Sequence, residues 1–177
     1  MDEFSYELKI PKDRIAVLIG SKGEIKQAIE EATHTHLEID SSEGDIFIKG
    51  SDGLGLYQAR EVVQAIGRGF NPEIALLLLK PDYSFELITM TDYHKTKKGM
   101  IRLKGRVIGK DGRSRELIEE LTETHITIYG KTIGIIGEAE RVPIARHALE
   151  SLLNGSPHSN VYHWLEKQRR KLRQGQV

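Results

Sequence analysis

Two short glycine turns carry the residue types that suit phosphate binding. The first turn is Gly20-Ser21-Lys22-Gly23 and the second is Gly109-Lys110-Asp111-Gly112, 89 residues further along the chain. A segment with helical periodicity follows each turn, and the N-terminus of a helix presents free backbone N–H groups and the positive end of the helix dipole. Because glycine lacks a Cβ, a sugar-phosphate backbone can come close to such a turn. The two turns therefore predict binding to a polymer of phosphates.

Both turns lie within a longer repeat. Of the 21 aligned positions from Ile19 to Ile39 and from Ile108 to Ile128, ten are identical. The identities include both glycines of each turn, an Ile-Glu-Glu run, two threonines and a histidine. A period of this length is too long for a solenoid repeat and fits two small domains. Two tethered copies of one phosphate-binding turn indicate a protein that grips a nucleic-acid strand at two places.

The charge of the chain is balanced overall but segregated along its length. There are 26 basic and 26 acidic residues, yet residues 101–115 hold six basic side chains against Asp111 alone. The matching window, residues 12–26, holds four basic and two acidic side chains. A nucleic-acid binder needs a positive surface, so we expect the second copy to supply most of the affinity. Arg106, Arg113 and Arg115 are the expected phosphate contacts around its turn.

Apolar residues beside each turn predict a narrow groove for about four unstacked bases, which are recognised by their edges. Its expected floor is Leu18 and Ile19 in the first copy, and Val107 and Ile108 in the second. Its expected far wall is Leu37 and Ile39, or Ile126 and Ile128. Aromatic residues make up only 6% of the chain and none lies beside a turn, which disfavours a platform that stacks bases.

The periodicity of apolar residues places each turn between two helices. In the first copy it predicts a strand at 4–10 whose apolar residues face inward, helices at 15–19 and 25–32, strands at 37–39 and 46–48, and a closing helix at 56–66. The second copy repeats this order, with about ten extra residues, 89–98, between its first strand and its turn. A helix at 72–79 should lie between the copies and set their orientation, and a basic helix should follow Pro157.

The order strand, helix, turn, helix, strand, strand, helix resembles the eukaryotic-type KH domain. The resemblance implies an α+β protein with two tandem KH domains of β-α-α-β-β-α topology, each a three-stranded antiparallel sheet packed by three helices. The expected divisions are a first KH domain at 1–69, an inter-domain helix and linker at 70–82, a second KH domain at 83–155 with the basic insertion 89–98, and a C-terminal basic helix at 156–177. The expected RNA-binding residues are Gly20, Ser21, Lys22, Gly23, Arg106, Ile108, Gly109, Lys110, Asp111, Gly112, Arg113 and Arg115.

The second copy also resembles a narrower group, the two-KH ribosome-assembly factors called partner of Nob and their KRR relatives. The similar segments are Gly105 to Arg113 and Leu153 to Tyr162, and the stretch Gly-Ser-Pro-x-x-x-Val-Tyr in the latter is the most diagnostic. This resemblance implies a protein that binds single-stranded RNA near the 3′ end of small-subunit rRNA during pre-rRNA processing, beside the Nob endonuclease. The absence of cysteine fits a reducing cytosol, so we expect a cytoplasmic location. Eukaryotic members have generally lost the first glycine turn, so the intact Gly20 and Gly23 indicate an archaeal-type member.

Other functional classes find little support in the sequence. There is no cysteine, which excludes disulfides, thiolate zinc sites and cysteine nucleophiles. The histidines have no accompanying carboxylate cluster, so we expect no metal and no other cofactor. Neighbouring acids such as Glu30-Glu31 do not face each other on a helix and are expected on solvated faces. Neither a nucleotide P-loop nor a Gly-x-Ser-x-Gly elbow is present, so we do not expect an enzyme.

The longest apolar run, Ile74 to Leu79, is far below the roughly 18 residues of a membrane span, so no membrane role is expected.

One alternative function stays open. A KH fold can keep its shape and serve as a protein-interaction adaptor, and the nearly neutral first copy could in this way recruit a nuclease or a translation initiation factor while binding little RNA.

Overall fold

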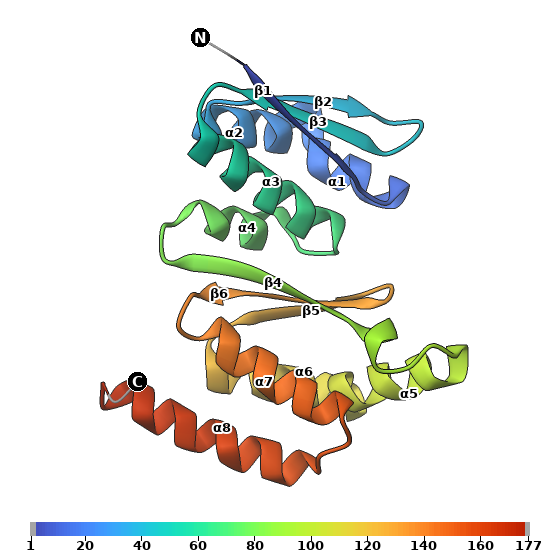
Figure 1. Cartoon of the computed structure of the whole chain (residues 1–177), viewed down its shortest axis with the longest axis vertical. Coiled ribbons are helices and arrows are strands. Elements are labelled where there is room, and N and C mark those ends of the chain that lie inside the picture. The colour runs from blue at the N-terminus through green and yellow to red at the C-terminus, as the bar shows by residue number, and fades with distance from the viewer. Residues whose placement is uncertain (1–2, 176–177) are drawn as a thin grey trace. The chain divides into compact units, whose positions relative to one another are not determined.

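A computed structural model describes residues 3–175, and the chain divides between Tyr83 and Ser84 into two compact units (Figure 1). Unit 1 contains the first glycine turn and unit 2 contains the second. Each unit is an α+β fold with a three-stranded antiparallel sheet and helices, as the sequence predicts.

Unit 1 follows the expected order of elements. The strands are β1 (Phe4–Lys9), β2 (His36–Asp40) and β3 (Asp45–Gly50), and the helices are α1 (Ile15–Ile19), α2 (Glu24–Thr33), α3 (Gly53–Gly67) and α4 (Pro72–Ala75). Single 3-10 turns occupy Lys12–Arg14, Ser21–Gly23 and Leu76–Leu79. The sheet order is β1-β3-β2, and both neighbours pair with β3 in antiparallel register. The predicted helix at 72–79 is therefore one turn of α-helix continued by a 3-10 turn, and it packs on α3.

The core of unit 1 lies between its sheet and its helices. Leu18, Ile29 and Ile66 from the helices meet Leu37 and Ile46 from the strands, and none of these side chains is more than 1% exposed. Apolar residues recur every three or four positions in the helices and every second position in the strands. This spacing puts them on the helix and sheet faces that meet in the core.

The expectation that the first strand buries all of its alternate apolar residues is wrong at its start. Phe4 is 57% exposed and Tyr6 is 43% exposed, and only at Ile10, which is 4% exposed, does the pattern reach the core. The reason is that β1 is an edge strand, and the Arg60 guanidinium of α3 lies 4.9 Å from the centre of the Tyr6 ring. An arginine with a long stem, and not an apolar side chain, covers this edge.

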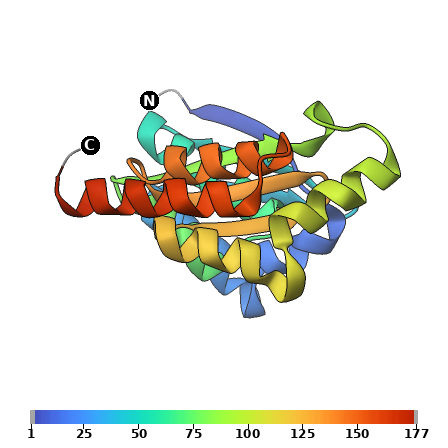
Figure 2. The ribbon, with the colours of Figure 1, turned by 90° about the horizontal axis from the view of Figure 1, so that it is seen from below.

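Unit 2 repeats the order and adds to it. Its strands are β4 (Tyr83–Thr89), β5 (His125–Tyr129) and β6 (Thr132–Glu138), and its helices are α5 (Lys97–Ile108), α6 (Arg113–Thr122), α7 (Val142–Leu153) and α8 (His158–Arg173). Single 3-10 turns occupy Met90–Asp92 and Lys110–Gly112. The sheet order is β4-β6-β5. Helix α8 lies alongside α7 in both views of the ribbon, and it buries Val161 and Leu165 in the core of the unit (Figure 2).

The glutamates that the two copies share make contacts that hold the fold together. Glu30 Oε2 accepts a hydrogen bond from the backbone N–H of Leu37 at 2.9 Å, and Glu119 Oε2 accepts one from Ile126 at the same distance. Both carboxylates therefore tie the second helix of their unit to the strand that follows. The expectation that these acids lie on solvated faces is wrong for Glu30 and Glu119, which are half-buried, while Glu31 is exposed.

The shared threonines form a second repeated contact. In unit 2, Thr122 Oγ1 donates to the carbonyl of Ile118 at 2.6 Å and lies 2.8 Å from Thr124 Oγ1. Thr33 and Thr35 make the same pair in unit 1 at 2.8 Å. All four side chains are buried, and Thr33 and Thr122 also donate to a helix carbonyl, so it is the hydroxyls of Thr35 and Thr124 that depend on their partners for a hydrogen bond.

This pairing predicts a non-additive effect on stability. Thr122→Val removes a buried partner and should lower the free energy of unfolding by about 1–3 kcal/mol, because the Thr124 hydroxyl is left unsatisfied. The double variant Thr122→Val/Thr124→Val should cost less than the sum of the two single changes. Chemical denaturation followed by circular dichroism measures both. Additive losses would show that the two hydroxyls do not satisfy each other.

Candidate nucleic-acid interface

The two glycine turns have the same backbone conformation. The φ angles are 75°, 55° and 76° at Gly20, Lys22 and Gly23, and 75°, 56° and 76° at Gly109, Asp111 and Gly112. Three of the four residues in each turn thus adopt a positive φ, a region that residues with a Cβ rarely occupy. The conformation reverses the chain between two helices and places the start of the second helix at the surface.

The two glycines within each turn meet different surroundings. A Cβ at Gly109 would lie 2.5 Å from Ser114 Cβ, and one at Gly20 would lie 2.5 Å from Ile25 Cγ1, so the first glycine packs directly on the second helix. A Cβ at Gly23 would meet nothing within 4 Å, and one at Gly112 would meet only Glu116 Oε1, at 4.0 Å. The second glycine therefore faces open space, and a ligand can approach its backbone there.

A hollow of about 460 Å³ lies beside the second turn. Its walls come from α5, the turn itself, the start of α6 and the start of α8, and its lining includes Arg102, Lys110, Arg113, Ser114, His158 and Tyr162. The Ser114 hydroxyl is buried and has no hydrogen-bond partner among residues 3–175. A buried hydroxyl without a hydrogen-bond partner lowers the stability of the fold. The Ser114 hydroxyl lies in the wall of a hollow that basic side chains surround.

Sequence reasoning missed Arg102, His158 and Tyr162 as residues of this hollow. His158 Nε2 lies 2.8 Å from the carbonyl oxygen of Arg106, and this contact ties the start of α8 to α5. Tyr162 is the tyrosine of the Gly-Ser-Pro-x-x-x-Val-Tyr stretch, so that stretch was a usable signal. Its distance from the turn along the chain hid the connection, because only folding brings α8 to the turn.

Arg106 has a role in the fold that the sequence did not predict. Its Nε donates to the carbonyl of Leu152 at 2.8 Å and its Nη2 donates to that of Ser156 at 2.6 Å. The guanidinium thereby satisfies carbonyl groups at and beyond the end of α7. Arg14 does the same in unit 1 with Ile66 and Phe70, both at 2.8 Å. A phosphate contact by Arg106 stays a prediction, in competition with these bonds.

Arg115 is also held by the protein. Its Nη1 lies 3.0 Å from Glu119 Oε1 and donates to the carbonyl of Ile126 at 3.3 Å. Lys110 and Arg113, by contrast, are exposed and take part in no ion pair within the described part of the chain. Of the basic side chains predicted around the second turn, these two are the ones best placed to meet a phosphate.

The expected floor and wall of the groove are partly wrong. Leu18 and Val107 are fully buried, and Leu37 and Ile126 are 1% and 3% exposed, so all four belong to the cores and cannot touch a base. Their neighbours Ile19, Ile108, Ile39 and Ile128 are half-exposed and remain available. The helix places Val107 and Ile108 about 100° apart, so only one of the two can face the sheet.

The first turn has the same backbone but a different charge. Ser21 and Lys22 are exposed, and Glu24 stands at the first position of α2, where Arg113 stands at the start of α6. A carboxylate at the start of a helix interacts favourably with the positive end of the helix dipole, but it repels an incoming phosphate. The geometry of phosphate approach is therefore repeated in unit 1, whereas the basic surroundings are not.

Between residues 3 and 175, no three His, Cys, Asp or Glu side chains gather in a way that could hold a metal ion. Over the same residues, no helix combines the length and the apolar character needed to cross a bilayer.

Comparison with family models identifies both units. Residues 84–170 match the model described as "Eukaryotic type KH-domain (KH-domain type I)", which includes most of α8, and residues 5–65 match the model described as "KH domain". The glycine turns thus lie within two KH domains.

Comparison with whole proteins gives the same result. A KH domain-containing protein of Methanocaldococcus jannaschii is 49% identical over 94% of this chain and 74% of its own length. The RNA-binding protein pno-1 of Caenorhabditis briggsae is 36% identical over 63% of this chain, but the match spans only 41% of that longer protein. The structure of an a/eIF2alpha-aDim2p-rRNA complex from Pyrococcus horikoshii matches with a TM-score of 0.89 and 43% identity, over 96% of each chain. The chain therefore belongs to the family of two-KH-domain proteins that includes archaeal Dim2p and the eukaryotic pno-1 proteins, as the resemblance in its sequence predicted.

Proposed function

We propose that this protein binds single-stranded RNA near the 3′ end of small-subunit rRNA, in pre-rRNA processing and ribosome assembly in the cytoplasm, and that it does so without catalysis. The observation that carries the proposal is the open backbone at Gly112, flanked by the exposed Lys110 and Arg113. Family membership supports it, because one relative is named as an RNA-binding protein and another is seen in a complex with rRNA.

The proposed mechanism uses the second turn as a phosphate cradle. A phosphate approaches Gly112, where no Cβ intervenes, and is attracted by the positive end of the α6 helix dipole. The N–H groups of Gly112 and Arg113 themselves donate to the carbonyls of Gly109 and Lys110. Lys110 and Arg113 add their charges from either side. The half-exposed Ile108 and Ile128 then form the apolar edges against which the bases lie, and recognition uses the base edges. The first turn has the same backbone conformation but less positive charge around it, so unit 2 contributes most of the affinity for RNA.

A second function is supported by unit 1. Four large apolar side chains are exposed there: Phe4, Tyr6, Leu54 and Tyr57, at 57%, 43%, 65% and 55%. Leu54 and Tyr57 are one turn apart on α3, and Arg60, one turn further, touches Tyr6 on β1. Aromatic residues with a neighbouring arginine are typical of protein interfaces. We propose that this apolar surface docks a protein partner, either a translation initiation factor or the Nob endonuclease.

Gly112→Asp tests the phosphate cradle. The added carboxylate occupies the open space in front of the turn and repels a phosphate there, so affinity for a single-stranded RNA with the rRNA 3′-end sequence should fall about tenfold or more, which is 1.4 kcal/mol or more. Fluorescence anisotropy measures the affinity. Gly23→Asp is the matched control, because it has the same φ and equally open surroundings in unit 1, and it should cost much less. Unchanged binding by Gly112→Asp would exclude the cradle.

The salt dependence of binding tests the two basic side chains. Neutralising Lys110 and Arg113 together as glutamines should lower the slope of log affinity against log salt by about 1.4, since each phosphate contact to a single strand contributes about 0.7. The control is Lys12→Gln with Lys80→Gln, which removes two exposed charges from unit 1 outside its glycine turn and should leave the slope nearly unchanged. An unchanged slope for the unit 2 variant would place the phosphates elsewhere.

The apolar surface of unit 1 is tested by Leu54→Asp with Tyr57→Asp. Both side chains are more than half exposed, so the fold should survive. Binding to the archaeal initiation factor subunit a/eIF2α, measured by calorimetry, should be lost while affinity for RNA is kept. Loss of RNA binding with the factor still bound would reverse the assignment of this surface.

A further inference from the structure

We propose that residues 89–98 of unit 2 build a second subsite that takes a nucleotide of the same RNA strand beyond the groove at the glycine turn. This inference rests on the proposed RNA-binding function and extends it to the length of strand that unit 2 holds. The subsite is a hollow of about 510 Å³, separate from the one beside Gly109. It is lined by Thr91, Lys95, Lys97, Met100, Ile101, Lys104, Gly130 and Lys131.

The inserted residues form a packed structure and not a loose loop. Met90 is fully buried, and its backbone N–H donates to the carbonyl of Lys131 at 2.9 Å, which joins the insertion to the β5–β6 turn. Tyr93 Oη donates to Glu150 Oε2 on α7 at 3.4 Å. Burial and the nearby Glu150 carboxylate raise the pKa of Tyr93, so its phenol stays a hydrogen-bond donor. The hollow thus has fixed walls from three parts of the unit.

The start of α5 is fixed in the same way. Thr96 is its N-cap, with Oγ1 accepting a hydrogen bond from Gly99 N at 3.0 Å. Any Cβ at Gly99 would overlap the ring of His94, so the loop lies directly on the helix. Helix α5 has 12 residues, whereas its counterpart α1 has five. The extra length carries the hollow, and unit 1 has no equivalent insertion.

The chemistry of the hollow matches a nucleotide. Lys95, Lys97, Lys104 and Lys131 surround it, and no acidic side chain lines it. Within residues 3–175, no ion pair engages any of these four lysines. Four unpaired cations around one hollow attract a phosphate. The apolar part is equally suited to a base, because Ile101 is 63% exposed and Met100 lies beside it.

The position of the hollow favours RNA over an acidic protein as the occupant. Lys97, Ile101, Lys104 and Ile108 follow one another along a face of α5 at spacings of three and four. From Ile101 to Ile108 the helix rises about 10 Å, a distance that a short single-stranded extension beyond the groove can bridge. The β5–β6 turn continues the opposite wall, from Ile128 to Lys131. One strand can therefore run from the glycine turn into the hollow.

The test compares short and long RNA on full-length protein. A short oligomer covers only the groove, and longer ones extend it by about three nucleotides at one end or the other. For the wild type, extension at one of the two ends should raise affinity about tenfold. In Lys95→Gln/Lys97→Gln/Lys131→Gln that gain should disappear, together with up to about 2 units of salt slope, while affinity for the short oligomer is unchanged. Ile101→Ala should reduce the gain severalfold.

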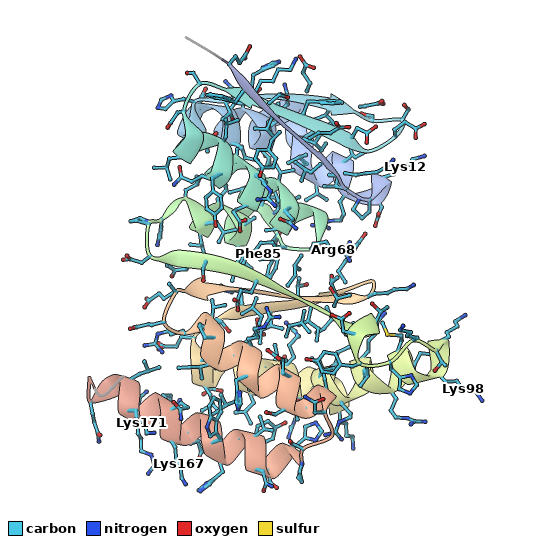
Figure 3. The ribbon with its side chains drawn as sticks, viewed as in Figure 1. Lys12, Arg68, Phe85, Lys98, Lys167 and Lys171 are labelled. Atoms are coloured by element: carbon cyan, nitrogen blue, oxygen red, sulfur yellow. The ribbon has the colours of Figure 1, made fainter. Side chains whose placement is uncertain are left out.

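The matched control removes three other lysines of unit 2. Lys98, Lys167 and Lys171 are exposed and do not line the hollow, and Figure 3 shows Lys98 at the outer start of α5 and the other two along α8. Their replacement by glutamine should leave the gain intact. Leu54→Ala, at a residue 65% exposed in unit 1, is the control for Ile101→Ala.

The contrary outcomes are separable. If the Lys95/Lys97/Lys131 variant keeps the full gain, or if the control loses as much, no subsite exists at the hollow. Equal losses on short and long RNA would mean that the lysines act only as diffuse charge, which also overturns the subsite. Loss of binding to an acidic peptide with the gain for RNA retained would make the hollow a protein surface. Failure of the wild type to bind any of the oligomers would overturn the proposed function itself.

Discussion

The packing of the first glycine of each turn against the second helix is the constraint on which the candidate interface depends. Gly20 and Gly109 leave no room for a Cβ because Ile25 and Ser114 lie directly behind them. This close approach, with the positive φ angles that follow, turns the chain sharply between two helices. The second glycine has open space where a Cβ would stand. A fold that packs one glycine closely against a helix thus leaves room at the other, and that is where a phosphate can come close.

The two units show how one scaffold can be tuned for different tasks. The repeated Ile-Glu-Glu run and threonine pair preserve the fold, since the glutamate binds the following strand and the threonines bind each other. Around the turns the residues diverge, with Glu24 in unit 1 where unit 2 has Arg113. Unit 2 also gains α8, which adds His158 and Tyr162 to a hollow beside the turn. Unit 1 instead exposes an aromatic surface on β1 and α3. Conservation of the scaffold and divergence of the surface are consistent with RNA binding led by one unit and protein docking by the other.

Much of the fold and part of the candidate site could be predicted from the sequence, because the same pattern of residues occurs twice in the chain. The order of elements, the turns and the exposure of Lys110 and Arg113 follow from periodicity and glycine spacing. The roles of Arg106 and Arg115 could not, since their partners at Leu152, Ser156 and Ile126 are brought close only by folding. The sequence also predicted more residues in the groove than the structure places there. An apolar residue beside a turn can face either the core or the ligand, as the buried Val107 and the half-exposed Ile108 show. Tyr162 was visible as part of a diagnostic stretch, but its place beside the turn was not.

The proposed function depends on contact between RNA and the backbone of the second turn. The most direct measurement is an NMR titration of the ¹⁵N-labelled, 20.0 kDa protein with the single-stranded rRNA 3′-end oligomer, following backbone amide shifts. We expect the amides from Lys110 to Arg113 to shift first and furthest, with smaller changes at Ser21 to Glu24. Shifts confined to unit 1, or to residues remote from both turns, would contradict it.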